Sequence, residues 1–266
     1  MSDDRPYRPG IESLFDVVAR LRAPGGCPWD REQTHESLRP YLLEETYELL
    51  EAIDAKDDAK MKEELGDVLL QVAMHAEIAA EEGRFSAVDV SEAAAAKMVA
   101  RHPHVFGDVA VANADEVLRN WEHAKVDEAR RAGRDGESVV DRVPSTLPAL
   151  AWTLGLQKRA ARVGFDFQSP TGAAEAVAEE ARELSDATNA EEAFDELGDL
   201  LFAVVALARK LKVNPEDALR VAGQRFRDRF AALEGSLKAE GIELRGLDAQ
   251  ELVRRWDAIP DKSKTV

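Results

Sequence analysis

Apolar residues recur along this chain at intervals of three and four, which is the spacing of a buried helix face. The first such stretch, 11–21, has apolar residues on one side: Ile11, Leu14, Phe15, Val18 and Leu21. Nine further helices are predicted, over 38–53, 61–82, 88–101, 114–132, 147–162, 172–187, 190–211, 215–240 and 249–258. Gly83 and Gly164 stand where two of them should end. Because no stretch alternates with the two-residue period of a strand, we expect an all-α fold.

An acidic pattern occurs twice in the chain. Its two copies are EETYE followed by ELGD, at 44–48 and 64–67, and EEARE followed by ELGD, at 179–183 and 196–199. Tryptophans repeat as well, since Trp121 and Trp256 are 135 residues apart. This internal duplication predicts two tandem helical modules. We place them at 1–130 and 147–266, with an exposed linker at 131–146.

Acidic residues within each copy share a helix face, because residues three or four apart on an α-helix are neighbours. Glu45 lies beside Glu48 on one predicted helix, and Glu64 lies beside Asp67 on the next. If these helices pack antiparallel, the four carboxylates converge, and they repel one another unless a cation lies between them. The second copy offers the same quartet: Glu180, Glu183, Glu196 and Asp199.

Both quartets offer only oxygen ligands, with no Cys or His at the repeated positions. Oxygen ligands suit a hard cation, so we expect Mg²⁺, with Mn²⁺ as the alternative, and not zinc. The other interpretation is a solvated acidic helix face, although apolar neighbours such as Leu65 and Leu197 favour the metal site. The helical glycines Gly66 and Gly198 predict either close approach of another segment or ligand, or a plain helix–helix contact.

Composition and charge narrow the function classes. The 266 residues carry 35 Lys and Arg against 52 Asp and Glu, which is a formal net charge of −17. This charge disfavours nonspecific binding to nucleic acid or an anionic membrane, so neither is an expected partner. The single cysteine, Cys27, excludes an intrachain disulfide. Neither a signal peptide nor an apolar run of membrane-spanning length is visible in the sequence, so we expect a cytoplasmic protein.

Basic and aromatic residues in the second copy suit a nucleotide substrate. Carboxylate-held Mg²⁺ commonly serves phosphoryl transfer, which also needs cations for the phosphates. Arg225 and Arg229 lie one helical turn apart, and Lys158 and Arg162 lie upstream on another predicted helix. Trp256 offers a flat surface for a base. Ordinary roles remain open for all of these residues, as surface ion-pair partners or, for Trp256, as a core anchor.

Several motifs together resemble the MazG family of bacterial nucleoside triphosphate pyrophosphohydrolases. They are QTH at 33–35, PYLLEETYE at 40–48, EELGD at 63–67, RHPHVF at 101–106 and GFD at 164–166. The resemblance covers nearly the whole chain. It implies an all-α fold whose helices pack as four-helix-type bundles completed by homodimerisation. It also implies Mg²⁺-dependent hydrolysis of NTPs and dNTPs to the monophosphate and pyrophosphate.

The resemblance also implies roles for individual residues. In the second copy the metal ligands would be Glu180, Glu183, Glu196 and Asp199, with Arg225, Arg229 and Trp256 near the nucleotide. The first copy supplies the metal ligands Glu45, Glu48, Glu64 and Asp67. It departs from the second at Val105, which stands where the second copy has Arg229. This difference puts turnover by the first module in doubt.

The expected reaction is attack of water on the α-phosphorus, with Mg²⁺ bridging the carboxylates and the triphosphate and pyrophosphate leaving. Glu179 or Asp195 would orient that water. A di-iron carboxylate bundle, a rival enzyme class, typically uses E-x-x-H motifs, and neither copy of the acidic pattern contains one. A non-catalytic nucleotide-binding regulatory module is the other alternative. It would need a broken quartet, whereas both quartets are intact.

Overall fold

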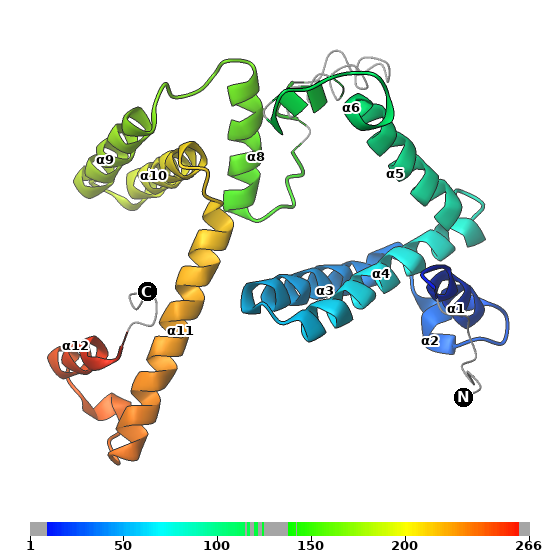
Figure 1. Ribbon diagram of the computed structural model, residues 1–266. Helices are drawn as coiled ribbons and strands as arrows, with labels where there is room; N and C mark the ends of the chain where they lie inside the picture. Colours follow the sequence, from blue (N-terminus) through cyan, green and yellow to red (C-terminus); the bar gives the residue numbers. More distant parts are fainter. Residues whose placement is uncertain are drawn as a thin grey trace. The chain divides into compact units, whose positions relative to one another are not determined.

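The structure is a computed structural model that describes residues 10–114, 116–117, 120–121, 124, 138–141 and 143–260. Its contacts divide the chain into two units, Met1–Arg134 and Asp135–Val266. All regular elements among the described residues are helical (Figure 1), which confirms the predicted all-α fold. Most of the helix expected at 114–132 and of the linker expected at 131–146 lies outside the described residues. The boundaries of the two modules remain a prediction.

The first unit is centred on a helix hairpin. Its elements are α1 (Glu12–Arg22), α2 (Pro28–Glu32), α3 (His35–Ala55), α4 (Asp58–Glu81), α5 (Ala87–Arg101) and α6 (Pro103–Phe106). Only Lys56 and Asp57 separate α3 from α4, so the two helices run antiparallel and lie side by side (Figure 1). Lys56 makes the turn in the left-handed region, with a φ of 54°. Asp57 then caps α4 by accepting from the N–H groups of Ala59 and Lys60.

The core of the first unit lies toward the C-terminal half of α4. Its buried apolar residues are Val18, Leu38, Ala73, Met74 and Ile78. They come from α1, α3 and α4, and α1 packs directly on α4. This core holds the hairpin together from one end, so the acidic positions at 64 and 67 lie outside the apolar cluster.

The second unit contains a matching hairpin. Its elements are α8 (Ala149–Arg162), α9 (Pro170–Asp186), α10 (Ala190–Lys210), α11 (Pro215–Ala239), the 3₁₀ helix η1 (Leu244–Gly246) and α12 (Ala249–Ala258). Residues 187–189 join α9 to α10, and Asn189 caps α10 by accepting from the N–H of Glu192. Helix α10 packs against both α9 and α8. Among the described residues, no helix has the length and apolar character needed to cross a bilayer.

Apart from the helix expected at 114–132, the helix positions agree with those predicted to within a few residues. The expected helix ends are also confirmed, because Gly83 and Gly164 take φ values of 68° and 91°, which favour glycine. The predicted helices do not include α2, a five-residue helix that begins at Pro28.

No other segment of the described chain approaches Gly66 or Gly198, while close approach of a ligand to these glycines stays a prediction. A Cβ added at either glycine would meet nothing within 4 Å among the described residues. Neither a neighbouring segment nor a helix–helix contact therefore requires glycine at these positions. Both glycines border open space on the helices that carry the acidic residues.

Arg22 fastens three elements of the first unit together. Its side chain is only 4% exposed, and its guanidinium donates to both carboxylate oxygens of Glu81, at 2.9 and 2.7 Å. It also donates to the backbone carbonyls of Asp30 and Gln33. One arginine thus joins the end of α1 to α2 and to the end of α4.

Replacing Arg22 by alanine should therefore destabilise the first unit. We expect Arg22→Ala to lower the free energy of unfolding by about 2 kcal/mol, because it removes charge-assisted hydrogen bonds from a buried site. Urea unfolding of the full chain, followed by circular dichroism, measures the change. Arg254→Ala is the control, because Arg254 is 77% exposed in its pair with Glu251 and should contribute less than about 1 kcal/mol. Equal losses in the two variants would contradict this role.

Candidate functional site

Carboxylates from the two helices of each hairpin meet at one point. In the first unit, one oxygen each from Glu45, Glu48 and Glu64 lies within 4.8 Å of the others. In the second unit, the same holds for Glu180, Glu183 and Glu196. Three of the four predicted acids thus converge in each copy, as expected for antiparallel helices. We refer to the two groups as the first and second acid clusters.

Asp67 and Asp199, the fourth acids of the predicted quartets, stand outside these tight groups but remain electrostatically coupled to them. Asp67 raises the pKa of Glu45 and of Glu64. Asp199 raises the pKa of Glu180 and of Glu196. Each aspartate therefore lies close enough to add negative charge to its cluster.

The first acid cluster is the more buried of the two. Glu64 is only 4% exposed, and burial, followed by the charge of Glu48, raises the pKa of its carboxyl. Burial likewise raises the pKa of Glu45, with further increases from Asp67 and Glu48. Lys60 partly offsets this charge, since its Nζ lies 3.9 Å from a carboxylate oxygen of Glu64. One lysine does not neutralise a group of four acids.

The second acid cluster is more open. Burial and then the charge of Glu183 raise the pKa of Glu180 and of Glu196. Glu183 and Asp199 are exposed. Within residues 143–260, no Lys or Arg forms an ion pair with any of these four acids. The cluster thus has no counter-charge among its described neighbours.

These clusters fit a hard divalent cation. Each offers several carboxylate oxygens, with little or no positive charge to balance them, and burial, followed by the charge of neighbouring carboxylates, raises the pKa of Glu64 and of Glu196. A cation between the carboxylates would remove that cost, and oxygen ligands of this kind suit Mg²⁺ or Mn²⁺. A cation held by either cluster could also take phosphate oxygens as ligands.

Other predicted residues lie around the second hairpin. Glu179 is exposed on α9 and adds to the rise in the pKa of Glu180. Asp195 is exposed on α10 beside Glu196. Lys158 and Arg162 are exposed on α8. No hydrogen bond or ion pair joins these residues to the carboxylates of the cluster within the described part of the second unit.

Arg229 and Trp256 contact each other, whereas Arg225 is exposed on α11. The guanidinium of Arg229 lies 4.2 Å from the centre of the Trp256 ring, and its Nη2 donates to the Trp256 carbonyl at 2.7 Å. Trp256 also lies against Phe226, with ring centres 5.2 Å apart. Helices α11 and α12 are thus joined by an arginine stacked on a tryptophan.

The corresponding positions in the first unit differ in backbone as well as in sequence. Helix α5 ends at Arg101 and α6 begins at Pro103, so the helical path is interrupted at His102. Val105 follows this break and is 63% exposed. By contrast, Arg225 and Arg229 lie on the uninterrupted helix α11. At these matched positions the second unit therefore has two arginines one turn apart on a single helix, whereas the first unit has an arginine and a valine separated by a helix break.

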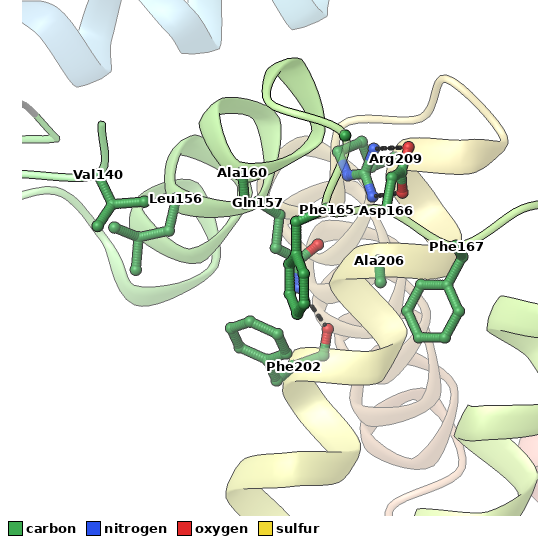
Figure 2. A pocket seen from close by; sticks show the side chains of 11 residues that line it. Val140, Leu156, Gln157, Ala160, Phe165, Asp166, Phe167, Phe202, Ala206 and Arg209 are labelled. Carbon is green, nitrogen blue, oxygen red and sulfur yellow. Dashed lines mark hydrogen bonds and ion pairs between the residues drawn. The ribbon is translucent and has the colours of Figure 1, made fainter. Parts of the chain in front are cut away.

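A pocket of about 460 Å³ opens beside α8 and α10 in the second unit (Figure 2). Its walls are mainly apolar and include Leu156, Ala160, Phe165, Phe167, Phe202 and Ala206. At its edge, Asp166 accepts from both terminal nitrogens of Arg209, at 3.1 and 2.5 Å, and from Lys210 at 2.7 Å. These cations hold the pKa of Asp166 far below its ordinary value, the hydrogen bond from Arg209 being the main cause.

Sequence reasoning missed this pocket. Phe165 and Asp166 were noted only as part of a motif, and Gln157, Phe202 and Arg209 were not singled out. The contacts that build the pocket join residues more than forty positions apart, from Asp166 to Arg209 and from Gln157 to Phe202. The only available signal was the aromatic–acid–aromatic run at 165–167.

Comparisons with known proteins identify the domains and several relatives of this chain. The profile of the MazG nucleotide pyrophosphohydrolase domain matches residues 33–106, and that of phosphoribosyl-ATP pyrophosphohydrolase matches residues 149–226. The chain is 45% identical to the nucleoside triphosphate pyrophosphohydrolase/pyrophosphatase MazG of Thermotoga maritima, over 93% of this chain and 94% of that protein. It is 42% identical to the nucleoside triphosphate pyrophosphohydrolase of Escherichia coli K12, over 94% and 96%. It is also 46% identical to the uncharacterised protein YabN of Bacillus subtilis, over 93% of this chain and 51% of that protein.

A divalent cation should stabilise the protein in a pH-dependent way. Folding raises the pKa of Glu45, Glu64, Glu180 and Glu196 above the ordinary 4.5, so the metal-free fold loses stability as the pH rises above that value. A bound cation reverses this loss. We expect little effect of Mg²⁺ near pH 4.5, and about 2.7 kcal/mol of added stability near pH 8 at about 100 times Kd.

Thermal unfolding with Mg²⁺ or a chelator, across this pH range, tests the expectation. Glu196→Gln should reduce the Mg²⁺ effect, because it removes one anionic ligand from the second acid cluster. Glu175→Gln, an exposed change two turns before Glu183 on the same helix, is the matched control. A Mg²⁺ effect that is independent of pH, or equal in the two variants, would refute metal binding at this cluster.

Proposed function

The chain belongs to the MazG family of nucleoside triphosphate pyrophosphohydrolases, and we propose that it hydrolyses NTPs and dNTPs to the monophosphate and pyrophosphate with Mg²⁺ as cofactor. The main observation behind this proposal is the pair of acid clusters, in each of which three carboxylate oxygens lie within 4.8 Å of one another. The relatives of similar length are named for the same activity. Mn²⁺, which also prefers oxygen ligands, is the alternative cation.

In the second unit, Glu180, Glu183, Glu196 and Asp199 would hold the cation. In the first unit, Glu45, Glu48, Glu64 and Asp67 would do so. The cation, when bound, neutralises charge on the triphosphate and makes the α-phosphorus easier to attack. The raised pKa of Glu180 and of Glu196 supports this assignment, because burial and then the charge of Glu183 disfavour the ionised carboxylates, and a bound cation would favour them.

The remaining chemistry falls to residues of the chain. Water attacks the α-phosphorus, the bond to the bridging oxygen breaks, and pyrophosphate leaves with that oxygen. Glu179 or Asp195 accepts a hydrogen bond from the water and then its proton, since both carboxylates are exposed beside the cluster. Arg225, Arg229, Lys158 and Arg162 are the cations we assign to the phosphates, and Trp256 holds Arg229 in place.

We propose that the second module carries most of the turnover. Both modules have acid clusters, so cation binding alone does not separate them. Arg225 and Arg229 stand one turn apart on α11, where both guanidinium groups can engage one triphosphate. The first module has the exposed Val105 in place of the second arginine, beyond a break in the helix.

Two matched double variants test the reaction and its location. We expect Glu196→Gln with Asp199→Asn to lower hydrolysis roughly a hundredfold or more, and Glu64→Gln with Asp67→Asn to leave most of it. Chromatography of an ATP digest measures the rate and identifies the products as AMP and pyrophosphate. Accumulating ADP would refute the reaction. Loss of hydrolysis only in the first-module variant would reverse the assignment of the modules.

We also propose that the protein is a homodimer. Helix α10 exposes a stripe of apolar side chains, with Phe194, Leu197 and Leu201 being 77%, 45% and 46% exposed. Leu197 and Leu201 follow Phe194 by three and seven positions, so the three side chains lie on one helix face. The equivalent face of α4 exposes Leu65 and Val72. A second copy of the chain would cover these faces and complete each hairpin as a four-helix bundle.

Light scattering tests the dimer. At micromolar concentration we expect twice the chain mass of 29.3 kDa. The variant with Leu197→Asp and Leu201→Asp should shift toward the single-chain mass, because charges would be buried at the interface. Leu219→Asp, at an exposed position on α11, should remain dimeric. A wild-type chain that scatters as 29.3 kDa would overturn the proposal.

A further inference from the structure

Two histidines of the first unit face each other where the N-terminus of α3 meets α4. The Nδ1 atoms of His35 and His75 lie 2.7 Å apart, in rings whose planes differ by only 5°. Because the ring centres are 5.0 Å apart, the two nitrogens lie between the rings, as in an edge-to-edge hydrogen bond. Arg84, in the turn between α4 and α5, joins the pair by donating from Nη2 to Nε2 of His35. We refer to these three side chains as the histidine latch.

The position of each proton in the latch follows from these contacts. An arginine only donates, so Nε2 of His35 is the bare acceptor and the proton of this ring lies on Nδ1. That N–H donates to Nδ1 of His75, which is therefore bare in its turn. Neutral His75 then has its proton on Nε2. Arg84 thus determines the tautomers of both imidazoles.

A second buried group on α4 agrees with this order of protons. Nε2 of His75 is buried and has no hydrogen-bond partner among the described residues. Gln71 precedes His75 by one helical turn, and its buried Oε1, an acceptor, has no partner there either. A proton on Nε2 of His75 gives this helix face a donor beside the acceptor, whereas a bare Nε2 would give it two acceptors.

The latch has no place for an additional proton. On Nε2 of His35, the proton would remove the acceptor of Arg84 and put an imidazolium against a guanidinium. On Nδ1 of His75, it would face the N–H of His35 across only 2.7 Å. Burial, followed by the charge of His35, accordingly lowers the pKa of His75 below the ordinary 6.5. The closed latch therefore requires two neutral histidines.

The charged groups of the neighbouring elements do not offset this requirement. Glu82 pairs with Arg84, and so its charge balances the guanidinium. Within the described residues, no carboxylate hydrogen-bonds to either imidazole. The other charged groups nearest to the latch in the chain, or joined to its elements, are Arg22 of α1, which pairs with Glu81 of α4, Glu32 of α2, Glu36 of α3 and Asp89 of α5, which accepts from Ser86.

A metal site is the usual other explanation of two facing imidazoles. Among the described residues, however, no group of three potential metal ligands includes His35 or His75. The guanidinium of Arg84 at Nε2 of His35 also disfavours a metal ion beside that ring. The contacts are instead those of a hydrogen-bonded chain.

We propose that the histidine latch is a pH-sensitive switch, which holds the turn 82–86 and the start of α5 against the hairpin while both histidines are neutral and releases them when one takes up a proton. His75 binds a proton less readily in the closed latch than after opening. The latch is therefore fully closed above the ordinary pKa of 6.5 and loses stability as the pH falls below it. Helix α5 also carries Arg101, which matches Arg225 by position, so the switch links pH to the placement of that arginine.

Hydrogen exchange of the full chain, followed by mass spectrometry, tests the switch. After correction for the intrinsic pH dependence of exchange, the opening equilibrium of peptides within 82–90 should rise about tenfold from pH 7.5 to pH 5.5. Linkage predicts this rise when opening frees one histidine with the ordinary pKa of 6.5. His75→Phe, which keeps a ring but takes up no proton, should remove the rise. His104→Gln, which changes a histidine of the same unit outside the latch, should keep it.

Two results of this experiment would overturn the proposal. One is an opening equilibrium that does not change with pH in the native chain. The other is a rise of equal size in His75→Phe.

Nitrogen NMR of the imidazole rings gives an independent readout in the native chain. Near pH 8 we expect neutral His35 with its proton on Nδ1 and neutral His75 with its proton on Nε2. Arg84→Ala, at a side chain that is 43% exposed, should abolish the preference for Nδ1–H at His35 and raise the opening equilibrium of 82–90 near pH 7.5. A charged His35 near pH 8, or a neutral His35 with its proton on Nε2, would contradict the latch.

Discussion

Repulsion between carboxylates that face one another across a helix hairpin is the constraint on which the account of this protein depends. Each hairpin brings together oxygens from both of its helices, and burial makes their joint ionisation costly. The fold tolerates this because other features hold the helices together. The turn at Lys56, the cap at Asn189 and the apolar core beyond the first acid cluster are examples. A bound cation would balance the negative charge of such an arrangement, which makes each acid cluster a candidate binding site for a cation.

The repeated units contain the same arrangement of carboxylates in two different surroundings. The first acid cluster is buried and carries Lys60 as a partial counter-charge, whereas the second is open and has none among the described residues. The second unit also has the long helix α11 and the aromatic pocket beside α10. These differences are the reason for proposing that the second unit carries most of the turnover.

Local patterns were enough to predict the helices and the convergence of acids. Three- and four-residue periodicity determines which face of a helix is buried, and a short connection forces two helices to run antiparallel, so Glu45 and Glu64 had to meet. Pairings between distant residues could not be read in this way. The contact of Arg229 with Trp256 and that of Gln157 with Phe202 depend on how helices pack. The open space beside Gly66 could not be predicted for the same reason, because it depends on whether another helix packs over that position.

The central claim is that the acid clusters hold divalent cations. Diffraction from crystals grown with Mn²⁺, recorded at the manganese absorption edge, tests it most directly because the anomalous signal locates the metal without assumptions about activity. The account predicts peaks among Glu180, Glu183 and Glu196 and among Glu45, Glu48 and Glu64. Peaks elsewhere on the protein, with none at either cluster, would contradict it.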